Sequence, residues 1–173
     1  MIRKANSQSD VNAVNDIYQA IFAAELAGVN YTGWREGWYP LLSDAQEHFD
    51  HDNLFVMENE EGKIIASVAL DNDQTDGYRD IAWEFEALPE EILVIHLLVV
   101  HPEEQGKGIS RKILDFSEDF GRENGCKIVR IDTATQNIPA QKAYSGYGYL
   151  ERGAFESRWE PGETYYVCYE KEL

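Results

Sequence analysis

The first third of the chain alternates between apolar and polar residues, first with a two-residue period and then with a helical one. MIRKA alternates as a short edge strand does, and Ser7 with Asp10 three residues later is similar to a helix-starting capping box. Apolar side chains then recur at three- and four-residue steps and mark the buried stripe of a helix that ends before Gly28. The stripe consists of Val11, Val14, Ile17, Tyr18, Ile21, Phe22 and Leu26. An edge strand followed by a core helix is therefore predicted.

The next stretch, YTGWREGWYP, gathers aromatic side chains around glycines and ends in a proline, which is typical of a shaped loop. These side chains either cover the core beside the first helix or line a pocket for an acceptor molecule, and the pattern fits both. They are Tyr31, Trp34, Trp38 and Tyr39. After a short helix expected over 43–49, NLFVMEN and GKIIASVAL flank a turn at 59–62 and predict an antiparallel hairpin. The polar run DNDQTDGYRDIAWEFEALPEE is expected to be a long connection.

The second half of the chain alternates strand and helix patterns. Residues 92–100 are almost wholly apolar, which predicts a central strand buried on both faces, with His96 its one ionisable residue. Helical periodicity follows over 113–120, and KIVRID then indicates another strand, so that the two strands form a parallel crossover. NIPAQKAYSGYG predicts a short helix with Pro139 in its first turn, and YLERGAFES and TYYVCYEKEL predict a closing hairpin. These elements together predict a mixed α/β sheet.

Length and composition narrow the class of protein. A chain of 173 residues with 43% hydrophobic and 27% charged residues is expected to form one globular domain over 1–173. A net charge of -17 repels polyanions, so nucleic acid is not expected as a partner. The same charge attracts cations, small amines included, although solubility alone is a sufficient reason for it.

Cysteine spacing and hydropathy predict neither a metal site nor a membrane segment. Cys126 and Cys168 are far apart and belong to no CxxC pair, so two buried thiols are expected rather than a zinc site or a disulfide framework. The stretch MIRKANSQSD lacks the apolar run of a signal peptide, and no apolar run is long enough to span a bilayer. We therefore expect a cytoplasmic protein without a membrane partner, and the sequence leaves monomer and homodimer open.

A glycine loop, HPEEQGKGIS, stands where a strand is expected to end and a helix to begin. Such a turn offers backbone N–H groups and the positive end of a helix dipole to a phosphate. A nucleotide P-loop requires Ser or Thr after the lysine, but Lys107 is followed by Gly108, and a dinucleotide fingerprint requires glycine where Arg111 stands. For the glycines alone, a simple turn that needs left-handed backbone angles remains open.

Two motifs together are more specific than the glycines alone. Gln105-Gly106-Lys107-Gly108-Ile109-Ser110 resembles the Q/R-x-x-G-x-G/A loop of the GNAT superfamily of acyl-CoA-dependent N-acetyltransferases, and it follows a strand that ends in LVVHP. Downstream, NIPAQKAYSGYGY resembles the N-x-x-A-x-x-x-Y-x-x-x-G-F segment of the same superfamily. Ser110 stands where Gly or Ala is usual, and its side chain is also small. Tyr149 stands where Phe is common, and its side chain is also aromatic. The resemblance extends from Ile92 to Tyr149.

The resemblance implies a fold and a co-substrate. The fold is the single-domain α/β GNAT fold, a mixed and mostly antiparallel sheet with a parallel strand pair splayed around the acyl-CoA site. Acetyl-CoA is the implied co-substrate, with no metal. Loop amides and basic side chains would hold its pyrophosphate, and the strand end would pair with its pantetheine and polarise its thioester carbonyl. The implied cofactor-binding residues are Leu98, Val99, Val100, Gln105, Gly106, Lys107, Gly108, Ile109, Ser110, Arg111, Asn137 and Tyr144.

Three residues are candidates for the chemistry. Tyr144 corresponds to the tyrosine that similar enzymes place near the thioester sulfur, and it is our candidate acid for the departing thiolate. His96 either takes the proton of the acceptor ammonium, directly or through water, or is a satisfied core residue. Asp132 is the second candidate base, since some members carry a carboxylate there, and it could equally cap the turn after its strand.

The leading hypothesis is an N-acetyltransferase that moves the acetyl group of acetyl-CoA to a primary amine by direct attack. A small-molecule amine is the preferred acceptor, because the aromatic loop and Trp159, just before a Pro161-Gly162 turn, are candidate walls of a pocket for a cation. A protein or peptide amine is the alternative acceptor. A non-catalytic acyl-CoA-binding sensor module is the alternative from another class of protein.

Overall fold

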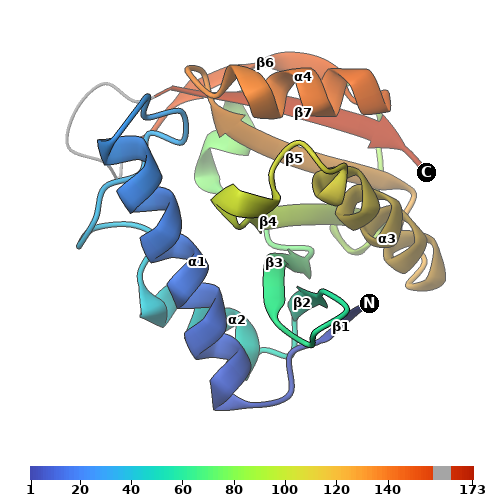
Figure 1. The fold of residues 1–173 in the computed structure, drawn as a ribbon. Helices are drawn as coiled ribbons and strands as arrows, with labels where there is room; N and C mark the ends of the chain where they lie inside the picture. Colours follow the sequence, from blue (N-terminus) through green and yellow to red (C-terminus); the bar gives the residue numbers. More distant parts are fainter. Residues whose placement is uncertain (158–164) are drawn as a thin grey trace. The chain divides into compact units, whose positions relative to one another are not determined.

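The first strand and helix form where the alternation of residues predicts them. The computed structural model describes residues 1–157 and 165–173. In it, β1 (Ile2–Lys4) pairs antiparallel with β2 (Leu54–Glu58), and α1 (Gln8–Leu26) follows β1 along the chain (Figure 1). The Ser7 hydroxyl caps α1 by accepting a hydrogen bond from the Asp10 amide at 3.3 Å. The capping box is only half formed, because the Asp10 carboxylate accepts from the Asn6 amide instead of returning to Ser7.

Asp10 is held by a bidentate ion pair that makes folding stability depend on pH. Arg3 donates to both carboxylate oxygens at 2.8 and 2.9 Å, and the Asn6 amide donates at 2.8 Å. The hydrogen bonds from Arg3 and then from Asn6 outweigh burial and lower the pKa of Asp10 from 3.8 to about 2. A lowered pKa stabilises the fold above the unfolded pKa, and this stability is lost as the pH falls through the folded value.

We therefore expect Asp10→Asn to cost about 2 kcal/mol of unfolding free energy at pH 5 and progressively less between pH 4 and 2. Urea unfolding of the wild type and the variant across this range measures the difference. An exposed acid, Asp50 at the end of α2, provides the control as Asp50→Asn, which is expected to show no such trend. A wild-type advantage that stays constant down to pH 2 contradicts this assignment.

The chain divides into two compact units. The first comprises Met1–Asn30, Trp34–Leu70 and His96–Phe116, and the second comprises Tyr31–Gly33, Asp71–Ile95 and Ser117–Leu173. The strand order is β1-β2-β3-β4-β5-β7-β6. Of these strands, β1, β2 and all but the last residue of β3 belong to the first unit. β4 contributes its second half to the first unit and its first half to the second.

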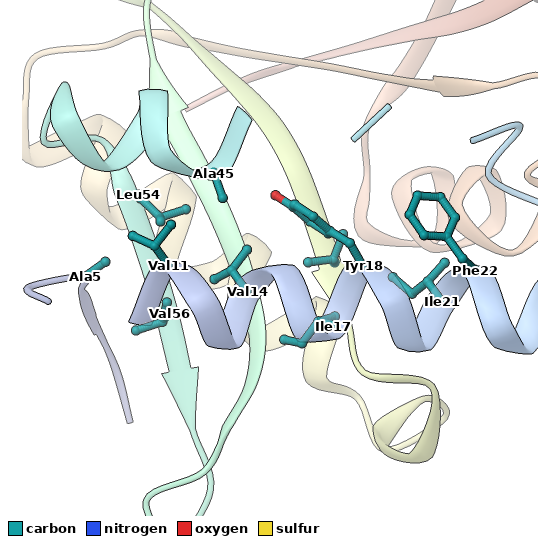
Figure 2. Packing of buried hydrophobic residues seen from close by; sticks show 11 residues of the cluster. Ala5, Val11, Val14, Ile17, Tyr18, Ile21, Phe22, Ala45, Leu54 and Val56 are labelled. Carbon is teal, nitrogen blue, oxygen red and sulfur yellow. The ribbon is translucent and has the colours of Figure 1, made fainter. Parts of the chain in front are cut away.

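The apolar stripe of α1 builds the core of the first unit. It packs with residues of β2, β4 and α2 (Leu42–Asp50), and Figure 2 shows this cluster along one face of α1. The buried members are Ala5, Val11, Val14, Ile17, Tyr18, Ile21, Phe22, Ala45, Leu54, Val56 and Val99. The prediction was wrong for Leu26, which is 82% exposed at the last residue of the helix. The predicted hairpin is confirmed: β2 pairs antiparallel with β3 (Ile64–Asp71), and the Gly62 amide donates to the Asn59 carbonyl in the turn.

The second unit contains the predicted parallel pair. β4 (Ile92–Val100) pairs parallel with β5 (Ile128–Ala134), from Ile92 opposite Ile128 to Ile95 opposite Ile131. α3 (Ile109–Glu123) lies between them along the chain. After α4 (Ile138–Tyr147), β6 (Leu150–Glu156) and β7 (Tyr165–Glu172) form the predicted antiparallel hairpin, and β7 lies between β5 and β6. The observed architecture is therefore the expected mixed α/β sheet, with antiparallel pairs and one parallel pair.

The long connection between β3 and β4 covers one face of the second unit. It holds two short 3-10 helices, η1 (Asp76–Asp80) and η2 (Pro89–Glu91), and its aromatic residues pack on the sheet. Tyr78 is buried against residues of β4, β5 and β7, and Trp83 lies edge-on to it at 5.1 Å between ring centroids. Both cysteines are buried and free, as expected. No helix among the described residues is long and apolar enough to cross a membrane.

A buried charged network fixes this connection to the sheet. Glu170 of β7 is fully buried, and its Oε1 accepts hydrogen bonds from the amides of Glu84 at 2.7 Å and Phe85 at 3.3 Å. The same oxygen accepts from Arg152 Nε at 2.8 Å. Arg130 lies opposite Glu170 in the register of β5 and β7, and its guanidinium donates to the Phe85 carbonyl at 3.4 Å. One carboxylate thus satisfies two backbone amides and one guanidinium away from water.

Candidate functional site

The second half of β4 departs from regular strand geometry where the candidate residues begin. Leu97 has a φ of 47°, in the left-handed region that a side-chain-bearing residue rarely adopts. The expectation of burial on both faces is confirmed for 92–95 and is wrong for 96–98 and Val100, which are half-buried. Val99 is buried in the core of the first unit. The irregular backbone at Leu97 interrupts the alternation of faces and changes the direction of the residues that follow.

The glycine loop joins β4 to α3 through the short helix η3 (Pro102–Glu104). Gly106 and Gly108 have φ values of 75° and 74°, and a Cβ added at either position would meet nothing within 4 Å. Both glycines are exposed, as are Gln105 and Lys107. The Lys107 ammonium forms an ion pair with the Glu104 carboxylate at 3.0 Å, on the surface, where such a pair is weak. At its two glycines the loop therefore presents bare backbone to open space.

This loop fits a diphosphate. The first hydrogen bond inside α3 runs from the Lys112 amide to the Gly108 carbonyl at 3.3 Å, so the amides of Ile109 and Ser110 have no acceptor within the helix. These amides lie at the positive end of the helix dipole, and glycine allows an oxyanion to approach the backbone closely. Ile109 is buried and anchors the start of the helix, Ser110 is half-buried, and Arg111 is exposed on the first turn.

In the first unit, the ring of His96 does not lie against apolar side chains alone. It stacks on the ring of His48, with 5.8 Å between centroids and 26° between planes. His48, which lies in α2, is not among the candidate residues predicted from the sequence. The contact joins segments far apart in the chain, and no local pattern around HFDHDN indicates it.

Tyr144 of α4 lies in an apolar and aromatic setting in the second unit. It is 6% exposed, and its ring is edge-on to Tyr169 at 5.8 Å between centroids. Burial raises the pKa of Tyr144 well above its usual value, and the charges of Asp132 and Tyr169 raise it further. The phenol therefore keeps its proton at neutral pH and can donate a hydrogen bond.

Asn137 and Asp132 have definite places in the same unit. The Asn137 side-chain oxygen accepts from the Ala140 amide at 3.3 Å and caps α4, which leaves the side-chain NH₂ outside the cap. Asp132 lies within β5, opposite Cys168 of β7 and two residues before the strand ends at Ala134. It is half-buried, and its charge acts on Tyr144.

The candidate residues are thus distributed over the two units. His96, Leu98, Val99, Val100 and residues 105–111 lie in the first unit, and Asp132, Asn137 and Tyr144 lie in the second.

The rings of the aromatic loop differ in burial. Trp34 packs on the core of the first unit, edge-on to Tyr18 at 6.0 Å and to Tyr39 at 6.1 Å between centroids. Trp38 is 54% exposed and Tyr31 is 41% exposed, so these rings do not form part of the core. Trp159 and the Pro161-Gly162 turn lie outside the described residues, and their part in a pocket stays a prediction.

A family model settles the relationship that the motifs indicate. The model of the acetyltransferase (GNAT) family matches residues 13–149, which is more than half of the chain. The chain belongs to the GNAT family. The chain is also similar to two curated relatives, both named uncharacterized N-acetyltransferases. The relative from Methanocaldococcus jannaschii is 25% identical over 70% of this chain, and the one from Bacillus subtilis is 27% identical over 57%. The matches span 52% and 66% of the lengths of these two GNAT relatives.

Solved structures share the fold over the whole chain. A GNAT family acetyltransferase from Streptococcus agalactiae matches with a TM-score of 0.76 and 20% identity, over 100% of this chain and 95% of that one. A protein of Salmonella typhimurium, solved with its cofactor acetyl-CoA, matches with a TM-score of 0.71 and 18% identity, over 100% and 93%. At these identities the likeness shows the GNAT fold.

Proposed function

We propose that this GNAT protein transfers the acetyl group of acetyl-CoA to a primary amine of a small molecule, and that residues 1–173 act as one domain. The observation that carries the proposal is the glycine loop at the start of α3. Its two left-handed glycines are exposed, open space surrounds them, and the first helical amides follow directly. Together with the family match, these features favour binding of a CoA pyrophosphate over a simple turn.

The residues of the first unit are assigned to binding and to proton removal. The amides from Gly106 to Ser110 hold the pyrophosphate, with positive charge added by Lys107 and Arg111. The backbone of β4 at Leu98 and Val100, beyond the irregular Leu97, pairs with the pantetheine, for which we infer a splayed strand end. Bound acetyl-CoA supplies the acetyl group as a thioester, whose C–S bond breaks as the amine nitrogen forms the new C–N bond.

The proton transfers are assigned to His96 and Tyr144. An acceptor ammonium has to lose a proton before its nitrogen can attack, and His96 is assigned to take it, directly or through water. Tyr144 donates its phenolic hydrogen to the departing thiolate, which leaves as the thiol of coenzyme A. The nitrogen loses its second proton on forming the amide, and a proton returns to the Tyr144 phenolate, so one proton in total is released to solvent. Asp132 remains the second candidate base, and Asn137 a candidate contact for the cofactor.

The backbone of the loop is tested most cleanly by a pair of glycine variants. Gly108→Ala is expected to weaken coenzyme A binding at least about tenfold, because a methyl group then occupies the path of the pyrophosphate. Gly62→Ala is the matched control: Gly62 also has a positive φ, 79°, and open space around it, but it lies in the hairpin turn. Both variants carry the same backbone strain, so only the first is expected to change the Kd in calorimetric titration. Equal Kd values for Gly108→Ala and the wild type contradict the assignment.

The acceptor class is tested by comparing kcat/KM values for thiol release. Polyamines, aminoglycosides, arylalkylamines, amino acids and short peptides with free N-termini or lysines form a suitable panel. The proposal predicts the highest kcat/KM with a small cationic amine, which the net charge of -17 and the exposed Trp38 and Tyr31 favour. The highest value with a peptide would identify the alternative acceptor class. Coenzyme A binding without release by any acceptor would favour the sensor module.

A further inference from the structure

Two imidazoles form a stacked pair in the first unit. His48 lies in the last turn of α2, and His96 lies on β4 directly before the irregular Leu97. The two rings are close to parallel, 26° apart with 5.8 Å between centroids, and both side chains are half-buried. We infer that His48 is a positioning residue that holds the imidazole of His96, by ring stacking, in the orientation in which it accepts the amine proton. This inference rests on the proposed function of His96.

His48 can hold another ring because it is itself held. Its Nδ1 lies 3.0 Å from Asn53 Oδ1, and with that oxygen as the acceptor Nδ1 carries the proton. Asn53 is in turn fixed through its backbone. Its amide donates to the His48 carbonyl at 3.0 Å, and its carbonyl accepts from the Leu70 amide of β3 at 3.0 Å. The His48 ring is therefore attached to a residue that is hydrogen-bonded to both the end of α2 and the sheet.

His96 needs such a partner because its strand does not fix its direction. In a regular strand, backbone alternation and packing on both faces determine where a side chain points. The left-handed Leu97 interrupts that alternation at the next residue, and His96 is half-buried rather than enclosed. A reacting group that is misplaced by about 1 Å can cost about 10²-fold in rate, so a stacking partner at this position is expected to act on kcat.

The test is a double-mutant cycle read on kcat and on the Kd of coenzyme A. His48→Ala is expected to lower kcat about 10- to 100-fold and to leave the Kd unchanged. In a His96→Ala background the same change is expected to cost nothing further, because His48 acts through His96. His48→Phe keeps a flat ring but loses the hydrogen bond to Asn53, so it is expected to recover only part of the lost kcat. His51→Ala, at the exposed C-terminal cap of α2, is the control and is expected to leave kcat unchanged.

A merely structural role would give different results. Equal losses of kcat from His48→Ala with and without His96, or no loss at all, overturn the inference. An unchanged kcat in His96→Ala also overturns the inference about His48. In that case, turnover by the wild-type protein in the same assay still supports the acetyl-transfer proposal. If no acceptor supports turnover, the ring-proton NMR signals of His96 still test whether the two imidazoles stack in solution. Signals that His48→Ala moves support stacking in solution, and signals that His48→Ala leaves in place overturn the inference.

Discussion

Replacing Tyr144 by phenylalanine is expected to lower kcat by about 10²- to 10⁴-fold, the range typical of a positioned acid or base. The change removes one oxygen from a side chain that is 6% exposed and keeps the ring that packs edge-on against Tyr169. Folding and coenzyme A binding are therefore expected to survive. The raised pKa keeps the phenol protonated at neutral pH, so the wild type always has the hydrogen to donate. Stopped-flow or steady-state thiol release measures the loss.

The control for this variant is a tyrosine that is buried just as deeply. Tyr18 is fully buried in the core of the first unit, and its hydroxyl has no hydrogen-bond partner among the described residues. Tyr18→Phe is therefore expected to leave kcat unchanged and to cost no stability. If Tyr144→Phe retains wild-type kcat, Tyr144 is a packing residue and another group protonates the leaving thiolate.

Removal of the buried Glu170 carboxylate is expected to have the largest effect on stability. Glu170→Ala leaves the amides of Glu84 and Phe85 without their acceptor, and it leaves the buried Arg130 guanidinium, whose Nε lies 3.7 Å from Glu170 Oε2, without its counter-charge. Breaking a buried, hydrogen-bonded ion pair from one side costs about 3–5 kcal/mol, because the partner charge stays buried and unpaired. We expect this decrease in the unfolding free energy, measured by guanidinium titration.

The matched control lies two residues along the same strand. Glu172 of β7 is exposed, so Glu172→Ala is expected to change the unfolding free energy by less than about 0.5 kcal/mol. The connection over 71–91 should also become more open in Glu170→Ala, with faster amide hydrogen exchange at Glu84 and Phe85 than at β2. A loss of stability equal to that of the control would show that water replaces the carboxylate at little cost.

Local patterns in the sequence predict most of the elements, because each depends on neighbouring residues. The apolar run over 92–100 is β4 as observed, and Gly148 ends α4 in the left-handed conformation expected of a helix cap. α3 begins at Ile109, earlier than its apolar periodicity indicates, because its first turn follows directly from Gly108. Leu26 fits the stripe of α1 but lies at its last residue, where 82% of it stays exposed among the described residues.

What the sequence could not predict depends on partners far along the chain. Arg130 is buried within KIVRID because Glu170 of β7 lies opposite it and the Trp83 ring lies 4.0 Å from its guanidinium. The stack of His48 on His96 and the pairing of Asp10 with Arg3 likewise join separate elements. The motif residues of the candidate site were predictable, because their spacing is local. The contacts between separate elements were not predictable, because they form only in the tertiary structure.

The most direct test of the central claim is product analysis by mass spectrometry. The purified protein is incubated with acetyl-CoA and the panel of amines and peptides, and acetylated amine and free coenzyme A are quantified together. We expect one amine to gain a single acetyl group, in an amount equal to the coenzyme A released, and we expect a strongly reduced yield with Tyr144→Phe. Coenzyme A that binds to the protein while no amine in the panel becomes acetylated would contradict it.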